Sequence, residues 1–279
     1  MPLDLHGTTA LVTGASSGIG VEIARALAVR GSDLVLVARR EDRLQQVAAE
    51  LAAAHGITAT VIPADLAAPG AGARLVADLA ARGLHVHTLV NNAGFGTYGP
   101  FGTIPLARTA QEIQLNVGTL VELTSALMPQ LIASQGIVLN LASTAAFQPT
   151  PGMAVYGATK AFVLSFTEAL WRETEGTGMR VLAVCPGGTD SEFGAVSGTT
   201  ASPAEFGKRQ SAADMVAEAM RALETTDAPS MVSGTRNRAL ARLVRLFPRR
   251  TAVAVSDRVM GRPRVRAGQV ASSVAGSAH

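Results

Sequence analysis

The residues with the clearest capacity for chemistry are Tyr156 and Lys160, with Ser143 thirteen residues upstream of the tyrosine. Positions four apart lie on one face of a helix, so the phenol and the ammonium would project side by side. A free phenol has a pKa of about 10 and is a poor base at neutral pH. A nearby positive charge lowers that pKa, whereas burial raises it. The pair therefore predicts a hydroxyl that gives or takes a proton near neutral pH.

The elements around these residues would bring them to a ligand-binding edge. Residues 161–171 have the pattern of a long amphipathic helix, and the apolar run 137–141 predicts a buried strand that ends just before Ser143. Ligands of open α/β sheets bind at the carboxyl ends of the strands. A Tyr-x-x-x-Lys pair also occurs by chance on long helices, so the rest of the chain decides its meaning.

A glycine-rich turn follows the first predicted strand. Residues 8–13 are apolar, Gly14, Gly18 and Gly20 come next, and a helix is predicted as far as Gly31. Such a strand–turn–helix unit lets the backbone approach a pyrophosphate, and the helix N-terminus favours its negative charge. The spacing is G-x-x-x-G-x-G, and the simpler alternative is a turn without a ligand. The flanking strand and helix favour a dinucleotide site.

Two arginines, Arg39 and Arg40, stand where the second predicted strand ends. An acidic residue at this edge would bind the ribose 2′-hydroxyl of NAD, whereas a guanidinium suits the 2′-phosphate of NADP. The alternative is a solvated helix start before Glu41 and Asp42. The arginines favour NADP(H) as the cofactor, with NAD(H) less favoured.

Strands and helices alternate along most of the chain, which predicts a doubly wound, seven-stranded parallel sheet of the Rossmann type in a single domain, residues 1–235. Further strands are expected at 34–38, 58–62, 86–90, 181–185 and 230–232, and helices at 41–55, 71–82, 105–132 and 211–224. Residues 190–210 are rich in Gly, Ser and Thr and predict a mobile loop.

Composition and length agree with such a domain. The chain has 279 residues, of which 48% are apolar and 16% charged. The single cysteine, Cys185, excludes an intrachain disulfide and favours a reducing compartment. We find no secretory signal pattern at the start and no apolar run of about 18 residues. We therefore expect a cytoplasmic protein, and the sequence predicts no metal site.

The positive charge is concentrated in a C-terminal extension, residues 236–279, with ten arginines and one acid. The net charge of +3 therefore divides into +9 for the extension and −6 for residues 1–235, so nucleic-acid binding by the whole chain is not expected. A basic amphipathic helix that Pro248 would end is predicted. It could lie on an anionic membrane, or pack on the domain or a partner subunit, and we favour packing. Its basic stripe is Arg238, Arg242, Arg245 and Arg249, and its apolar residues are Leu240, Leu243, Val244 and Phe247.

Taken together, residues 5–235 resemble the short-chain dehydrogenase/reductases. The motifs that carry the resemblance occur in the family's order and at its usual separations. They are Thr13-Gly14-Ala15-Ser16-Ser17-Gly18-Ile19-Gly20, Asp65, Asn91-Asn92-Ala93-Gly94, Asn116, Ser143, Tyr156-x-x-x-Lys160 and Pro186-Gly187.

The resemblance implies a role for each of four residues. Tyr156 would be the general acid/base, and Lys160 would lower its pKa and hydrogen-bond the nicotinamide ribose. Ser143 would hold the substrate oxygen, and Asn116 would support a water that leads protons away. The physical reading agrees, because hydride transfer from a cofactor leaves the protein to protonate the developing alkoxide.

The resemblance also implies a set of cofactor contacts. Asp65 would touch the adenine, and the segment 186–191 would hold the nicotinamide. Ser191 is a departure, because relatives often have threonine there. The predicted contacts are Gly14, Ser16, Ser17, Gly18, Ile19, Gly20, Arg39, Arg40, Asp65, Leu66, Asn91, Asn92, Ala93, Gly94, Tyr156, Lys160, Pro186, Gly187, Thr189 and Ser191.

We therefore expect an NADP(H)-dependent oxidoreductase of carbonyls or secondary alcohols. The competing hypothesis is a nucleotide-sensing or regulatory protein that keeps the fold without chemistry. A homo-oligomer, dimer or tetramer, is expected. The pocket wall should come from 95–104, 145–155 and 190–210, and its side chains suggest an apolar substrate. Those side chains are Phe95, Tyr98, Phe101, Phe147, Met153 and Phe193.

Overall fold

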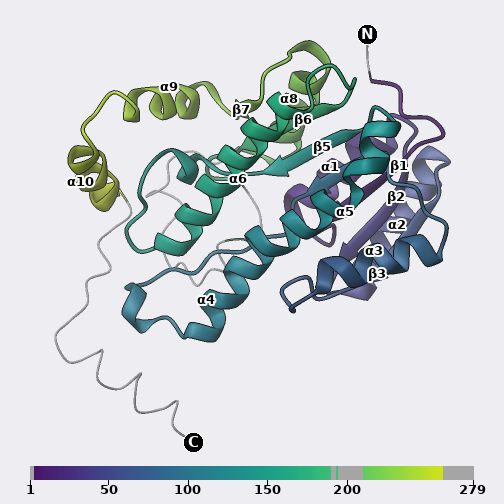
Figure 1. Cartoon of the computed structure of the whole chain (residues 1–279), viewed down its shortest axis with the longest axis horizontal. Helices are drawn as coiled ribbons and strands as arrows, with labels where there is room; N and C mark the ends of the chain where they lie inside the picture. The colour runs from purple at the N-terminus through teal and green to yellow at the C-terminus, as the bar shows by residue number, and fades with distance from the viewer. Residues whose placement is uncertain (1–2, 190–192, 194–209, 260–279) are drawn as a thin grey trace, which may run out of the picture.

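A seven-stranded parallel sheet runs through the centre of the molecule (Figure 1). The computed structural model describes residues 3–189, 193 and 210–259. Along the sheet the strand order is β3-β2-β1-β4-β5-β6-β7. The chain adds β2 and β3 on one side of β1 and then crosses to add β4 to β7 on the other side. This is the predicted doubly wound sheet. Its strands are β1 (Thr9–Thr13), β2 (Asp33–Ala38), β3 (Ala59–Pro63), β4 (Thr88–Asn91), β5 (Ile137–Leu141), β6 (Arg180–Cys185) and β7 (Ser230–Val232).

Helices cover both faces of the sheet because buried parallel strands are apolar on both sides. On one face lie α1 (Gly18–Ala28), α2 (Glu41–His55) and α8 (Ala212–Thr225), which bury Ile23, Leu44 and Met215 against the strands. On the other face lie α3 (Ala71–Ala81), α5 (Thr119–Ala133) and α6 (Ala154–Glu173). The predicted alternation of strands and helices is confirmed to within a few residues at each boundary.

The largely helical segment predicted over 105–132 is confirmed, although it is not one uniform α-helix. The chain forms α4 (Leu106–Ile113), a π-helical turn η2 (Gln114–Gly118) and then α5. A π-turn inserts extra backbone into a helix and is frequent at functional sites. Two short 3-10 helices, η1 (Phe101–Thr103) and η3 (Thr144–Phe147), lie in the loops after β4 and β5.

The basic extension forms two helices, α9 (Thr235–Val244) and α10 (Arg249–Val259). As predicted, the first ends before Pro248, since proline lacks the donor that a continuing helix needs. The second helix was not predicted. Packing on the domain buries Ala241 and part of Val244, whereas Leu243 and Phe247 each stay 47% exposed.

A polar network lies inside the sheet, between β4, β5 and the helices over them. Asn91 Nδ2 donates to Asn140 Oδ1 at 2.9 Å and to Thr124 Oγ1 at 3.1 Å, and Asn140 Nδ2 donates to Thr167 Oγ1 at 2.9 Å. All four residues are buried. Because buried polar groups must be paired, this network ties β5 to α6, the helix that carries Tyr156 and Lys160.

Replacing Asn140 with alanine should therefore destabilise the protein by about 1–3 kcal/mol, because it removes the acceptor for Asn91 and the donor to Thr167. Urea unfolding followed by circular dichroism measures the change. Gln45→Ala, at an exposed position of α2, is the control and should change the free energy of unfolding by less than about 0.5 kcal/mol. Equal effects of the two substitutions would contradict the importance of the network.

Candidate active site

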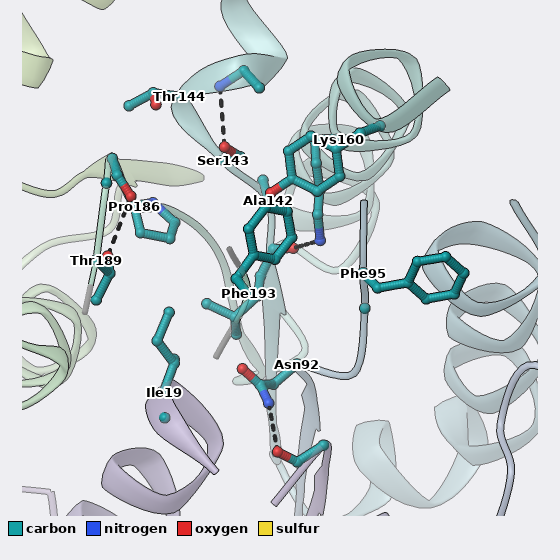
Figure 2. A pocket seen from close by; sticks show the side chains of 18 of the residues that line it. Ile19, Asn92, Phe95, Ala142, Ser143, Thr144, Lys160, Pro186, Thr189 and Phe193 are labelled. Atoms are coloured by element: carbon teal, nitrogen blue, oxygen red, sulfur yellow. Dashed lines mark hydrogen bonds between the residues drawn. The ribbon is translucent and has the colours of Figure 1, made fainter. Parts of the chain in front are cut away.

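A cavity of about 1660 Å³ opens at the carboxyl ends of the strands. Its walls come from the segments that follow β1, β2, β3, β4, β5 and β6, together with residues of α6, α9 and α10. Figure 2 shows Ile19, Asn92, Ser143, Lys160 and Pro186 around one space, although they lie far apart in sequence. The parallel sheet therefore brings most of the predicted site residues together.

The glycine turn brings the start of α1 close to the end of β1. A Cβ atom on Gly20 would collide with the carbonyl oxygen of Gly14, so the helix can approach the turn only with glycine at this position. Gly14, Gly18 and Ile19 line the cavity beside the N-terminus of α1. This backbone cradle, with the helix dipole pointing into it, suits a pyrophosphate.

Two basic side chains follow the end of β2, as the sequence predicted. Arg39 and Arg40 are exposed and line the cavity. The Arg40 guanidinium donates from Nη2 to Ser16 Oγ at 3.2 Å, which joins this edge to the glycine turn. Asp65, at the next strand end, also lines the cavity and accepts the backbone N–H of Ala67 at 3.1 Å.

The two asparagines after β4 have different surroundings. The Asn92 amide donates to the carbonyls of Thr13 at 2.8 Å and Gly14 at 3.2 Å and lines the cavity (Figure 2). Asn91 does not line it, because its amide belongs to the buried network with Asn140. The side chain of Asn91 therefore holds the strands together, and its contact with a cofactor stays a prediction.

Lys160 reaches from α6 to the end of β5. Its side chain is 6% exposed, and Nζ donates to the carbonyl oxygen of Leu141 at 2.6 Å (Figure 2). The ammonium lies 5.8 Å from the centre of the Tyr156 ring. Burial lowers the pKa of Lys160 to about 8, because an ammonium loses hydration there.

The state of Tyr156 differs from the expectation that the lysine would lower its pKa. Burial raises the pKa of Tyr156 to about 12, and a hydrogen bond with Ser143 opposes the rise only in part. The nearby carboxyl of Glu112 adds to the rise. Desolvation of the phenolate is therefore the larger effect in this structure, and the hydroxyl keeps its proton at neutral pH.

Ser143 follows β5, has an extended conformation and is the N-cap residue of η3. Its Oγ accepts the backbone N–H of Ala145 at 3.1 Å, which caps the 3-10 helix and fixes the side chain at the cavity edge. The same hydroxyl hydrogen-bonds Tyr156. Ser143 is thus held near the end of β5, and Tyr156 is held in the first turn of α6.

Asn116 lies in the π-turn and is 1% exposed. Oδ1 accepts the N–H of Phe95 at 3.1 Å, and Nδ2 donates to the carbonyl of Phe95 at 2.9 Å and to Thr159 Oγ1 at 3.1 Å. The side chain therefore ties the loop after β4 to α6. Its predicted contact with a water stays a prediction.

A buried carboxyl near this site was missed by the sequence reasoning. Glu112, on α4, is 0% exposed; its Oε2 accepts the Thr97 hydroxyl at 2.7 Å, and Oε1 has no hydrogen-bond partner among the described residues. Burial raises its pKa, while Arg108 and Lys160 act in the opposite direction. Nothing in the sequence marks it, because its position on α4 has no recognisable motif.

The segment after β6 meets the extension. A Cβ atom on Gly187 would collide with the Asn237 side chain of α9, whose Nδ2 donates to the carbonyl of Ser233 at 2.9 Å. Thr189 Oγ1 donates to the carbonyl of Gly187 at 3.2 Å. The predicted contact at Ser191 and most of the predicted loop 190–210 lie outside the described residues.

The inner part of the cavity is apolar. Phe95, Phe147, Met153 and Phe193 line it, as the sequence predicted. The ring of Phe193 lies 5.0 Å from that of Tyr156, between ring centres. Tyr98 and Phe101 do not line the cavity, and Phe101 is 62% exposed.

The extension completes the wall in a way that the sequence did not reveal. Leu240 and Val244 of α9 and Val255 and Ser256 of α10 line the cavity. Ser256 is 1% exposed, and its hydroxyl has no hydrogen-bond partner among the described residues. No group of three or more His, Cys, Asp or Glu in the described part of the chain could hold a metal ion.

Comparison with known proteins agrees with this geometry. A family model described as short chain dehydrogenase matches residues 8–201. The sulfoacetaldehyde reductase 2 of Chromohalobacter salexigens is 39% identical over 186 residues, which is 66% of this chain and 73% of that protein.

Solved structures resemble the chain over most of its length. A 7β-hydroxysteroid dehydrogenase is 27% identical with a TM-score of 0.82, covering 91% of this chain and 99% of its own. A short-chain dehydrogenase from Sphingobium yanoikuyae in complex with NADPH is 32% identical with a TM-score of 0.76, covering 94% of this chain and 99% of its own.

Proposed function

The chain belongs to the short-chain dehydrogenase family, and we propose that it is an NADP(H)-dependent oxidoreductase of carbonyls and secondary alcohols. The observation that carries the proposal is the grouping of Ser143, Tyr156 and Lys160 on one wall of a cavity whose other end is a glycine cradle. When bound, the nicotinamide supplies or accepts the hydride.

The residues at the ends of β1 and β2 suit NADP. The cradle around Gly14 and Gly20 would hold the pyrophosphate, and Arg39 and Arg40 would hold the 2′-phosphate by charge-assisted hydrogen bonds. The NADPH complex of the Sphingobium yanoikuyae relative supports this choice. Lys160, with Nζ at the end of β5, would bind the ribose.

The protein groups would supply the proton. In the reducing direction a hydride adds to the carbonyl carbon, the C=O π bond breaks, and the oxygen takes the proton from the Tyr156 hydroxyl. Ser143 would donate a hydrogen bond to the same oxygen. The tyrosine then regains a proton from solvent. Asn116 would support a water that leads protons away, and its side chain also holds Phe95 and Thr159 in place.

The Tyr156 hydroxyl carries the proton that reduction needs at neutral pH. With a pKa of about 12 the hydroxyl is a proton donor over the ordinary pH range, whereas alcohol oxidation needs the phenolate. Lys160 is charged below its pKa of about 8. The apolar wall formed by Phe147, Met153 and Phe193 supports a substrate with an apolar body.

Replacing Arg39 with Asp and Arg40 with Ala should weaken NADPH binding far more than NADH binding. A charged hydrogen bond to phosphate is worth about 1.5–3 kcal/mol, so the dissociation constant of NADPH should rise at least tenfold. Fluorescence titration of each reduced cofactor measures this. A wild-type protein that binds NADH more tightly than NADPH would refute the cofactor assignment.

Tyr156→Phe keeps the ring and removes the proposed proton donor. Reduction of ketones and aldehydes, followed as NADPH oxidation, should fall about 100-fold or more, while NADPH binding stays within a few-fold. Tyr98→Phe is the matched control, because Tyr98 does not line the cavity. Activity of Tyr156→Phe close to that of wild type would contradict the mechanism. NADPH binding without turnover of any carbonyl by wild type would favour the nucleotide-sensing alternative.

A further inference from the structure

The two helices of the extension carry a surface that is both basic and apolar. Residues 236–258 contain seven arginines and one acid, Asp257. Leu246 is 80% exposed, and Leu243 and Phe247 are each 47% exposed. We call these three apolar residues, with Arg238, Arg242, Arg249 and Arg250, the docking surface.

Contacts among the described residues do not account for this surface. α9 packs on β7 and η3, and Arg245 stacks on the ring of Phe147 at 5.2 Å. In the described part of the chain, by contrast, Arg238, Arg242 and Arg249 have no carboxylate within salt-bridge distance. The described residues therefore supply neither charge pairing nor full apolar burial for this surface.

Figure 1 shows where the surface lies. α9 and α10 form an arm at one end of the molecule, beyond β7 and away from α2 and α3. The bend between them follows from Pro248, which lies between the two helices.

We propose that the docking surface binds an anionic lipid bilayer. Arginines near a membrane are attracted to phosphate headgroups, and exposed Leu and Phe side chains on the same short helices can enter the boundary of the acyl chains. No described helix is long and apolar enough to cross a membrane. The contact is therefore peripheral, and it weakens as salt screens the charges.

The same two helices also line the catalytic cavity, so a bilayer contact would bear on catalysis, a point that rests on the proposed function. Leu240 and Val244 of α9 and Val255 of α10 line the catalytic cavity. A bilayer bound to these two helices would thus lie close to that cavity. Substrates that partition into lipid would then reach Tyr156 without crossing bulk water.

Co-sedimentation of the full chain with vesicles tests the proposal. One set contains phosphatidylcholine alone, and the other adds phosphatidylglycerol, each at low and physiological salt. We expect binding only to the anionic set, and weaker binding at the higher salt. Arg238→Gln, Arg242→Gln and Arg249→Gln together should reduce that binding about tenfold or more.

The matched control removes the same charge elsewhere. Arg43→Gln on α2, Arg74→Gln on α3 and Arg82→Gln at the C-cap of α3 should together change vesicle binding by less than about twofold if the arm is the contact. Leu246→Gln should weaken binding with all arginines present. Neither set lies in the catalytic cavity, so turnover of a small water-soluble carbonyl should match wild type. That readout separates failure of docking from failure of the proposed function.

Three results would overturn the proposal. The first is no binding to anionic vesicles at low salt. The second is equal loss of binding in the arm and control variants. The third is a self-associated wild type in analytical ultracentrifugation that the arm substitutions dissociate, since a second copy of the chain would then cover the surface.

Discussion

The structure depends on one costly placement, a lysine ammonium buried at the end of a central strand. Lys160 Nζ is compensated by the Leu141 carbonyl at 2.6 Å, and this contact fixes α6 against the end of β5. An ionised group loses much hydration free energy on burial, and a single neutral acceptor offsets only part of that loss. The lowered pKa of Lys160, about 8, is the consequence. Tyr156, four residues earlier, is partly buried at the wall of the cavity, and burial raises its pKa to about 12.

Around this placement, buried polar side chains lock the neighbouring elements. Asn140 joins β5 to α6 through Thr167, and Asn116 joins the loop after β4 to α6 through Thr159. Each is an amide that satisfies several partners at once, so each fixes the relative position of two elements. Glu112 is the exception, since one of its oxygens has no partner among the described residues. Its carboxyl raises the pKa values of both Tyr156 and Lys160, so it acts on the same proton equilibrium from the side of α4.

The sequence predicted the sheet and the placement of most site residues because parallel strands direct their carboxyl ends to one edge. For this reason the cavity is lined by the glycine turn, Arg39, Ser143 and the Tyr156–Lys160 pair. It failed where tertiary context decides. Helical periodicity does not reveal that the chain widens into a π-turn at Asn116, or that the side-chain amide of Asn116 hydrogen-bonds the backbone of Phe95. Spacing likewise predicted that the lysine lowers the pKa of the tyrosine, whereas burial is the larger effect and raises it. The sequence did not predict α10, because Pro248 followed by Arg249 and Arg250 resembles the end of a helix and not the start of another.

The central claim is that burial keeps Tyr156 protonated, and therefore a proton donor, at neutral pH. The chain has two tyrosines, so in Tyr98→Phe the absorbance of tyrosinate reports on Tyr156 alone. A pH titration of this variant should show no tyrosinate through about pH 10, where a free phenol is half ionised. Ionisation with a midpoint well below that value would contradict the account and would show that the charge of Lys160, and not burial, controls the hydroxyl.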